Sequence, residues 1–205
     1  MKKTLFRTLL FLVLAATLTL SACQKSEEPT QNAPSYDEAK LNEYIAPFAY
    51  TGLTVELTED DALKSESVWK LILDNAELLD YPEDAVEYYA EQLRDTYRYY
   101  AEKNDWSYEK ALEFFDVSEE KILDEAREMV KGDLVYRYIV KDAEITLSED
   151  EKSAQWNRYV KKFAEDYGYT EDYVEENMQD LIYDSMLYDK TMEYLIVNNT
   201  FIKNH

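Results

Sequence analysis

Reactive side chains are few in this 205-residue sequence, and their positions limit the chemistry it can perform. The single cysteine, Cys23, follows an apolar run, and the single histidine is the last residue, His205. A catalytic cysteine–histidine pair, a catalytic triad and a zinc site built from nitrogen and sulfur ligands are therefore excluded. Cys23 also has no second cysteine with which to form a disulfide, so its expected use is as an attachment point.

The residues before Cys23 are typical of a bacterial export signal. A basic start precedes LLFLVLAATLTL, an apolar run that is too short to span a membrane as a mature helix. The run ends in LSAC, which resembles the lipobox in which a cysteine receives lipid and becomes the mature N-terminus. We predict a signal peptide over residues 1–22, lipidation of Cys23 and a flexible tether over 23–35; an ordinary signal peptide is the alternative. The protein would then be a cell membrane lipoprotein, held by its lipid anchor on the extracytoplasmic face.

Carboxylates are abundant, with 44 Asp and Glu against 22 Lys and Arg and a formal charge of −22. Such a charge argues against nucleic acid and anionic lipid as partners and favours basic ones. Acidic clusters such as EEKILDE and SEDE do not match the spaced, glycine-containing EF-hand loop, and no glycine-rich phosphate loop is present. We therefore expect no metal, no cofactor and no nucleotide. With so many carboxylates, any one pair chosen for glycoside hydrolysis carries no information.

Tyrosine is the unusual residue type, with 19 in the chain. Its ring offers apolar area with a polar end, which suits half-exposed binding surfaces. Four tyrosines on apolar helical stripes are expected in the core, namely Tyr89, Tyr97, Tyr159 and Tyr167. A binding role is predicted for seven other aromatic residues: Tyr88, Tyr99, Trp106, Tyr136, Tyr169, Tyr173 and Tyr183. For Trp106 and Tyr169, which lie at interruptions of the helical pattern, packing within the bend is the favoured role and contact with a client is the alternative.

Helices must position these side chains. All four prolines lie at or before Pro82, and only two glycines follow it, which favours long helices. Apolar residues recur at helical spacing over 65–79, 81–104 and 108–115, and again after Ser118, Ser148 and Thr170. Helix starts are predicted at Ser107, Ser118 and Thr170 and at a capping box from Ser148 to Glu151, and a helix end at Gly168.

The same order of features occurs twice, in YAEKNDWSYEKALEFF (100–115) and FAEDYGYTEDYVEENM (163–178). Each stretch has an aromatic residue, Ala-Glu, a polar break, a second aromatic residue, a Ser or Thr and a new helical run. We therefore predict an all-α protein with two helical hairpin arms, each ending in a bent tip. The exception is segment 44–57, where Gly52, Thr54 and Val55 favour a short strand or extended arm.

Four longer stretches carry a family resemblance: VWKLILDNAELLDYPEDAVEYYAEQL, EEKILDEAREMVKGDLVYRYIVKDAEITLSEDE, YGYTEDYVEEN and MLYDKTMEYLIVNN. From about Val68 to Ile202 the chain resembles the C-terminal chaperone domain of trigger factor, which is similar to the helical part of SurA-type periplasmic chaperones. The step from Glu144 to Glu151 fits the pattern that precedes the second arm in that family. The resemblance implies a domain over residues 61–205 whose helical arms form an open cradle for unfolded or nascent exported polypeptides.

The sequence also departs from that family. Nothing resembles a ribosome-docking domain, and the FKBP-type isomerase domain is expected to be missing, because Leu57 is followed almost at once by the VWKLILDNAE helix. Residues 36–60 are therefore interpreted as an extended lead-in beside the missing domain, and no catalytic residues are carried over. The expected function is that of a membrane-anchored, ATP-independent chaperone, or holdase. The alternatives are a protein related to peptidyl-prolyl isomerases and an adaptor lipoprotein for one folded partner.

Overall fold

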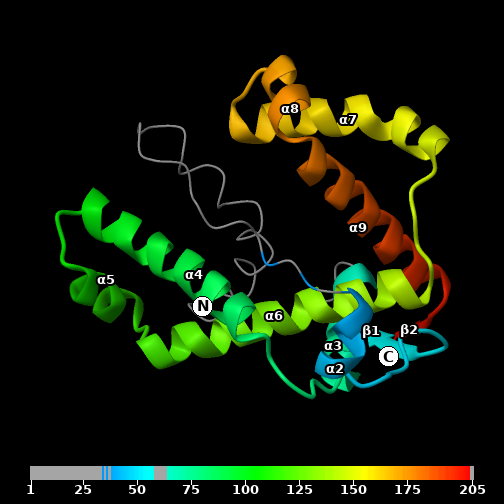
Figure 1. The fold of residues 1–205 in the computed structure, drawn as a ribbon, viewed down its shortest axis with the longest axis horizontal. Coiled ribbons are helices and arrows are strands. Elements are labelled where there is room, and N and C mark those ends of the chain that lie inside the picture. Colours follow the sequence, from blue (N-terminus) through cyan, green and yellow to red (C-terminus); the bar gives the residue numbers. More distant parts are fainter. Residues whose placement is uncertain (1–33, 35, 37, 58–63, 204–205) are drawn as a thin grey trace.

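The computed structural model describes residues 34, 36, 38–57 and 64–203. The predicted signal peptide and Cys23 lie outside the described residues, and so does all of the tether except Pro34. His205, the last residue of the chain, also lies outside them. The described chain is mainly helical, as predicted, and forms a base from which two arms extend in different directions (Figure 1). No helix in this part of the chain is long and apolar enough to cross a membrane.

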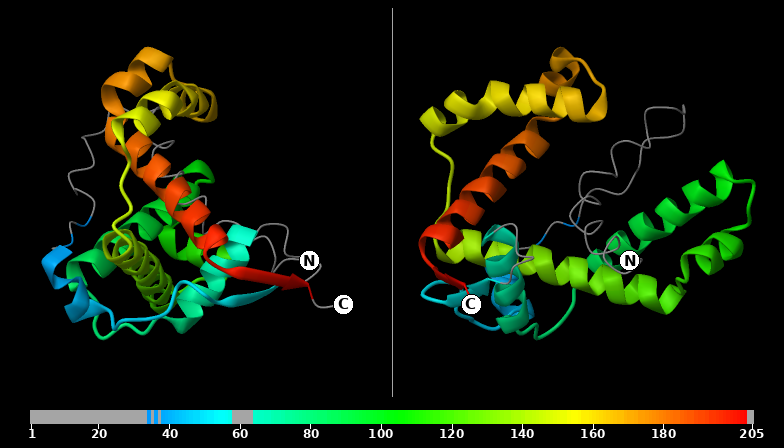
Figure 2. Two further views of the ribbon diagram at one scale, coloured as in Figure 1. Left: turned by 90° about the vertical axis from the view of Figure 1, so that its right-hand side faces the viewer. Right: turned by 180° about the vertical axis from the view of Figure 1, so that it is seen from behind.

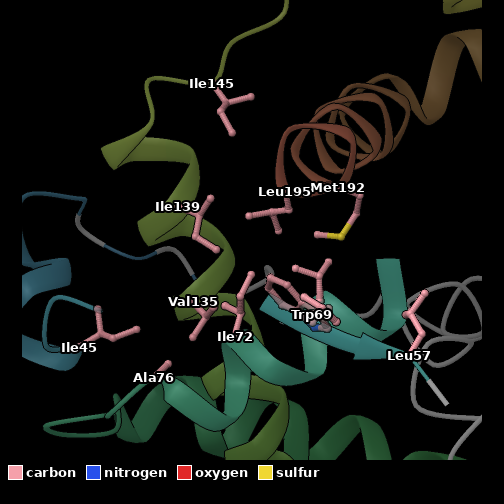
Figure 3. Packing of buried hydrophobic residues seen from close by; sticks show 12 residues of the cluster. Ile45, Leu57, Trp69, Ile72, Ala76, Val135, Ile139, Ile145, Met192 and Leu195 are labelled. Carbon is pink, nitrogen blue, oxygen red and sulfur yellow. The ribbon is translucent and has the colours of Figure 1, made fainter. Parts of the chain in front are cut away.

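The base brings together the beginning and the end of the described chain. It contains η2 (Glu38–Lys40), α2 (Leu41–Tyr44), β1 (Thr54–Leu57), α3 (Lys64–Asn75) and β2 (Thr200–Lys203). The two strands pair in parallel, with Thr54 opposite Thr200. Ile72 of α3 meets Ile139 and Leu195, which come from the two long helices that lead into the arms, in a shared hydrophobic core (Figure 3). The base is therefore the point from which both arms are held.

Asn199 joins β2 to the segment before β1. Its side-chain oxygen accepts a hydrogen bond from the N–H of Leu53 at 2.8 Å. Its amide group donates to the carbonyls of Tyr50 at 3.0 Å and Leu195 at 2.7 Å. Strand β2 was not predicted, because so short a strand depends on a partner that is far away in the sequence.

The lead-in predicted over 36–60 is only partly extended. Its described part includes the helical turns η2 and α2 before β1 begins. Ile45 and Val55 are buried in the base core. Apolar burial of this kind stabilises the fold by about 25 cal/mol per Å². The described lead-in is therefore a structural part of the base.

The first arm is a hairpin of α4 (Glu83–Lys103) and α6 (Glu119–Asp142), with α5 (Tyr108–Phe115) at its tip. Leu93, Ile122 and Ala126 are buried where the two long helices face each other. As predicted, Ser107 and Ser118 cap α5 and α6, because each side-chain oxygen accepts the N–H of the third residue on.

The second arm consists of α7 (Glu149–Tyr167), α8 (Glu171–Asn177) and α9 (Gln179–Val197). The predicted capping box of Ser148 and Glu151 starts α7, and Gly168 ends it with a left-handed φ of 71°. Thr170 caps α8, also as predicted. Buried side chains from α7, α8 and α9, including Val160, Val174 and Ile182, form a core of the arm's own. Figure 2 shows the two arms diverging from the base, with α5 and α8 at their far ends.

The first predicted helix is shorter than expected. α3 ends at Asn75, whereas the pattern predicted helix to residue 79. The chain leaves the helix because Leu78 bridges to Ile45 and the N–H of Leu79 bonds to the Tyr44 carbonyl at 2.8 Å. As a result the side chain of Leu79, whose helical spacing matches that of Val68 and Ile72, is 57% exposed.

Candidate functional site

Aromatic side chains gather at the far ends of both arms. The group on the first arm, here called the α5 aromatic cluster, consists of Tyr97, Tyr99, Tyr100, Trp106, Phe114 and Phe115. Successive ring centroids in it are 4.9 to 5.8 Å apart. Rings at such distances and tilted orientations attract one another beyond the effect of area burial. The tip therefore carries a connected aromatic surface.

Two adjacent phenylalanines divide the α5 aromatic cluster into an inner and an outer part. Because neighbouring residues on a helix point in different directions, Phe115 turns toward Tyr97 and Tyr100 of α4, at 5.8 and 5.2 Å. Phe114 turns outward instead and is 66% exposed. It stays in contact with Trp106, at 4.9 Å between ring centroids. Phe114 and Trp106 thus form the outer face of the tip.

The predicted residues Trp106 and Tyr99 each lie under a lysine. Lys110 Nζ is 5.1 Å from the Trp106 ring, and Lys103 Nζ is 5.3 Å from the Tyr99 ring. Both rings are half-buried, so they keep open surface. Tyr100, which shares the helical spacing of Leu93 and Tyr97, is 41% exposed, since it packs on α5 rather than on α6. The bend at Trp106 is therefore both packed internally and open to solvent.

The second arm carries the α8 aromatic cluster, which consists of Tyr159, Phe163, Tyr167, Tyr169 and Tyr173. Its ring centroids follow one another at 4.5 to 6.5 Å. Tyr159 and Phe163 are buried, whereas Tyr173 is 44% exposed. The predicted residues Tyr169 and Tyr173 are the closest pair, at 4.5 Å. The exposed end of this cluster therefore lies at the turn into α8, and its buried end continues into the core of the arm.

The other three predicted residues lie away from these tips. Tyr88 is half-buried on α4 and contacts the Tyr89 ring at 5.3 Å. Tyr136 packs against the base core and the ring of Tyr188, and its hydroxyl is buried. Tyr183 is 36% exposed on α9, with Lys152 Nζ 5.8 Å from its ring. The structure therefore brings Tyr99 and Trp106 together at one tip and Tyr169 and Tyr173 at the other.

Sequence reasoning missed Phe114, the most exposed aromatic side chain among the described residues. The signal was present in the segment YEKALEFF. On a helix of eight residues, Ala111 and Leu112 already provide the buried side. Only one of two consecutive phenylalanines can then face the arm, and the other has to face solvent.

The root of the first arm contains a mostly buried carboxylate. Asp133 of α6 accepts hydrogen bonds from Arg137 at 3.0 Å and from the Tyr89 hydroxyl at 3.3 Å. Burial raises the pKa of Asp133, and the nearby Arg137 opposes that change. Arg137 also lies 4.8 Å from the ring of Tyr36, which is itself buried. This group of side chains fastens the start of the described chain to α6.

The exposed clusters suit binding through apolar contact. Exposed aromatic groups of this kind mark interaction surfaces on soluble proteins.

Burial and the Glu125 carboxylate raise the pKa of Tyr97 to about 12, so its hydroxyl keeps its proton. Across the described part of the chain, no group of three or more His, Cys, Asp or Glu is placed to hold a metal ion.

Comparison with known proteins gives one family match. The model described as the C-terminus of bacterial trigger factor protein matches residues 56–197. No curated protein and no solved structure gives a significant match. The matched residues include Glu56 and Leu57 of β1, all of α3 and every helix of both arms.

Proposed function

Because the chain belongs to the trigger factor C-terminal family, we propose that it is a membrane-anchored, extracytoplasmic holdase for unfolded or nascent exported polypeptides. The observation that carries this proposal is the pair of exposed aromatic clusters at the ends of two separate arms. Phe114 and Trp106 offer apolar area on one arm, and Tyr169 and Tyr173 offer it on the other.

Two weak contact points suit a client that has no fixed structure. When one segment of a flexible polypeptide is bound, the second binding event becomes intramolecular, and the combined affinity exceeds that of either contact. Each contact alone can still open and close quickly. Release then follows from folding of the client, which hides its apolar residues, and no nucleotide is needed.

The charge of the chain supports a preference among clients. With 44 acidic and 22 basic residues, the protein repels acidic polypeptides and attracts basic ones over distances of about 8 Å at physiological salt. Long-range attraction raises the encounter rate, and aromatic contacts then hold the chain. We therefore expect clients with apolar segments flanked by Lys or Arg.

The proposed anchor lies at Cys23, outside the described residues. A lipidated cysteine followed by residues 24–35 would keep the domain close to the membrane face at which exported chains emerge. Replacing Cys23 with Ser removes the thiol to which lipid would be attached. Metabolic labelling with a radioactive fatty acid is expected to mark the unchanged protein and not the variant. Absence of label from the unchanged protein would contradict the anchor and leave the holdase proposal standing.

Aggregation of chemically unfolded model proteins tests the holdase proposal. Purified residues 24–205 are expected to suppress light scattering of several unrelated clients at about one-to-one ratio. Phe114→Ala should weaken suppression, whereas Leu79→Ala should not, although Leu79 is a comparably exposed apolar residue of the base. If no client is protected, or if one folded partner is captured in fixed stoichiometry instead, the proposal is wrong.

A further inference from the structure

The helix α5 lies between two residues of unusual backbone geometry. Asp105 and Asp116 have φ values of 53° and 56°, in the left-handed region that residues other than glycine seldom adopt. Asp tolerates this region better than most residues, at a cost of about 1 kcal/mol. The eight residues of α5, from Tyr108 to Phe115, are thus joined to both long helices of the arm through sharp turns. These turns are the natural points for α5 to rotate.

One carboxylate connects α5 to both long helices. Glu119 is the first residue of α6. Its Oε1 accepts a hydrogen bond from the Tyr108 hydroxyl of α5 at 2.7 Å. Its Oε2 accepts one from Arg94 Nε of α4 at 3.0 Å. The two oxygens of a single side chain therefore hold three helices in a fixed relation.

The arginines around Glu119 are themselves held in place. Arg94 also donates to Glu87 at 2.7 Å and to Glu91 at 3.2 Å, and its side chain is only 16% exposed. The Arg98 guanidinium lies 5.8 Å from the centre of the Tyr108 ring. Its partners on α4 are Glu91 and Asp95. Tyr108 is thus held at its hydroxyl by Glu119 and at its ring by Arg98.

The position of α5 determines how the α5 aromatic cluster is presented. Phe114 and Phe115 are part of α5, and Trp106 lies between Asp105 and the start of the helix. A rotation of α5 about its two turns would move these three rings relative to Tyr97 and Tyr100, which stay on α4. Few buried contacts oppose such a movement, since Ala111 is the only fully buried residue of α5 and Leu112 is the partly buried one that packs on the core of the arm.

We propose that Glu119 is a positioning residue for α5, and that its bonds to Tyr108 and Arg94 keep Phe114 and Trp106 on the outer face of the first arm. When the bond to Tyr108 is removed, α5 rotates about Asp105 and Asp116, and the outer aromatic face is no longer held in one arrangement. The effect on client binding rests on the proposed function, whereas the movement of α5 does not.

Hydrogen exchange on the full chain in detergent tests the movement. Tyr108→Phe removes the hydroxyl and keeps the ring beneath Arg98. Losing one hydrogen bond of this kind should speed amide exchange across residues 106–118 about threefold to tenfold. Exchange in α3 and α9 should stay unchanged. Tyr50→Phe is the matched control, because the Tyr50 hydroxyl also donates to an exposed carboxylate, that of Asp142, but in the base.

Two further readouts separate positioning from simple stabilisation. The indole NMR signal of Trp106 should shift in both Tyr108→Phe and Glu119→Ala. The melting temperature followed by signals from residues of the base should stay unchanged in both variants. Glu119→Asp, which keeps the carboxylate, should restore part of the native signal. Unchanged exchange and an unchanged Trp106 signal in both variants would overturn the inference.

Client binding then tests the functional part. If α5 moves in Tyr108→Phe, affinity for an unfolded client should fall at least about threefold, in line with the lost hydrogen bond. If α5 moves and affinity stays constant while Phe114→Ala still weakens binding, Glu119 does not position the binding surface. If the unchanged protein binds no client at all, the proposed function fails, and the exchange result still decides the movement of α5.

Discussion

Lys190 of α9 lies 2.6 Å from the Glu151 carboxylate at the start of α7, and it donates a second hydrogen bond to the Thr146 carbonyl at 2.7 Å. The residues between α6 and α7 are thereby fastened to the returning helix. Ile145 on one side of Thr146 is buried in the base core, and Leu147 on the other is buried in the core of the second arm. Lys190 therefore sets the direction in which the second arm leaves the base.

Lys190→Met should loosen this connection. The variant keeps the length of the side chain but loses both hydrogen bonds, and we expect it to lower the free energy of unfolding by at most about 1 kcal/mol. Exchange of the amides at residues 145–151 should rise, measured by hydrogen exchange. The bond to Lys190, together with hydrogen bonds from Ser148, lowers the pKa of Glu151 to about 2. The stability that ionised Glu151 contributes to the fold is therefore present at and above pH 4.5, the ordinary pKa of Glu, and is lost as the pH falls toward 2. A variant with unchanged exchange at this connection would contradict the role of Lys190.

Mild acid should stabilise the protein. Burial raises the pKa of Asp133, Asp184 and Glu125, so the folded state binds their protons more tightly than the unfolded state does. Stability linked to these groups therefore increases as the pH falls from about 7 to about 5. Protonation also relieves repulsion in a chain with a formal charge of −22. Urea unfolding at both pH values measures the effect.

Asp133→Asn is the control for that pH dependence. The amide oxygen can still accept a hydrogen bond from Arg137, but the titration is removed. We expect the gain in stability between about pH 7 and about pH 5 to become smaller in this variant. An identical gain in both proteins would show that Asp133 does not contribute to it.

Asn199→Ala should destabilise the base. The substitution leaves the N–H of Leu53 and the carbonyls of Tyr50 and Leu195 without their partner. We expect the free energy of unfolding to fall by about 2 kcal/mol. Asn198→Ala is the matched control, since its exposed side chain bonds only to the Tyr194 carbonyl and should cost less than about 0.5 kcal/mol. Equal effects in chemical denaturation would remove the special role of Asn199.

If both aromatic clusters hold one client, their losses should multiply. Phe114→Ala and Tyr173→Ala are each expected to lower client affinity about threefold, and the double variant about tenfold. Val197→Ala, at a highly exposed apolar residue away from both clusters, should leave affinity unchanged. Fluorescence titration with a labelled, permanently unfolded client provides the measurement. If the double variant binds the client no more weakly than the weaker-binding single variant does, the client contacts only one arm.

Local signals in the sequence were sufficient to predict the long helices of the arms and their capped ends. Ser107, Ser118 and Thr170 cap helices as predicted, and Gly168 ends α7, because each cap depends on residues only a few positions away. The family resemblance was confirmed over residues 56–197. By contrast, β2 depends on β1 across most of the chain, and α3 stops early because Leu78 pairs with Ile45.

The candidate site was harder to predict than the fold. Helical periodicity places Tyr97 and Tyr100 on one side of α4, yet only Tyr97 has both α5 and the arm core against it. Tyr100 lies closer to the tip and remains exposed. Exposure of an aromatic residue depends on where the partner helix ends, and periodicity within one helix does not contain that information. The prediction that these residues bind clients stays a prediction.

The parallel pairing of β1 with β2 gives the domain a modular construction. Strand β1 precedes both arms in the chain and β2 follows them, so each arm is an excursion that leaves the base and returns to it. An arm of this kind can be lengthened, shortened or exchanged by changing one continuous stretch of sequence, while the base and the other arm keep their contacts. The reach of the protein can thus change in evolution, or by design, without rebuilding the part that holds it together.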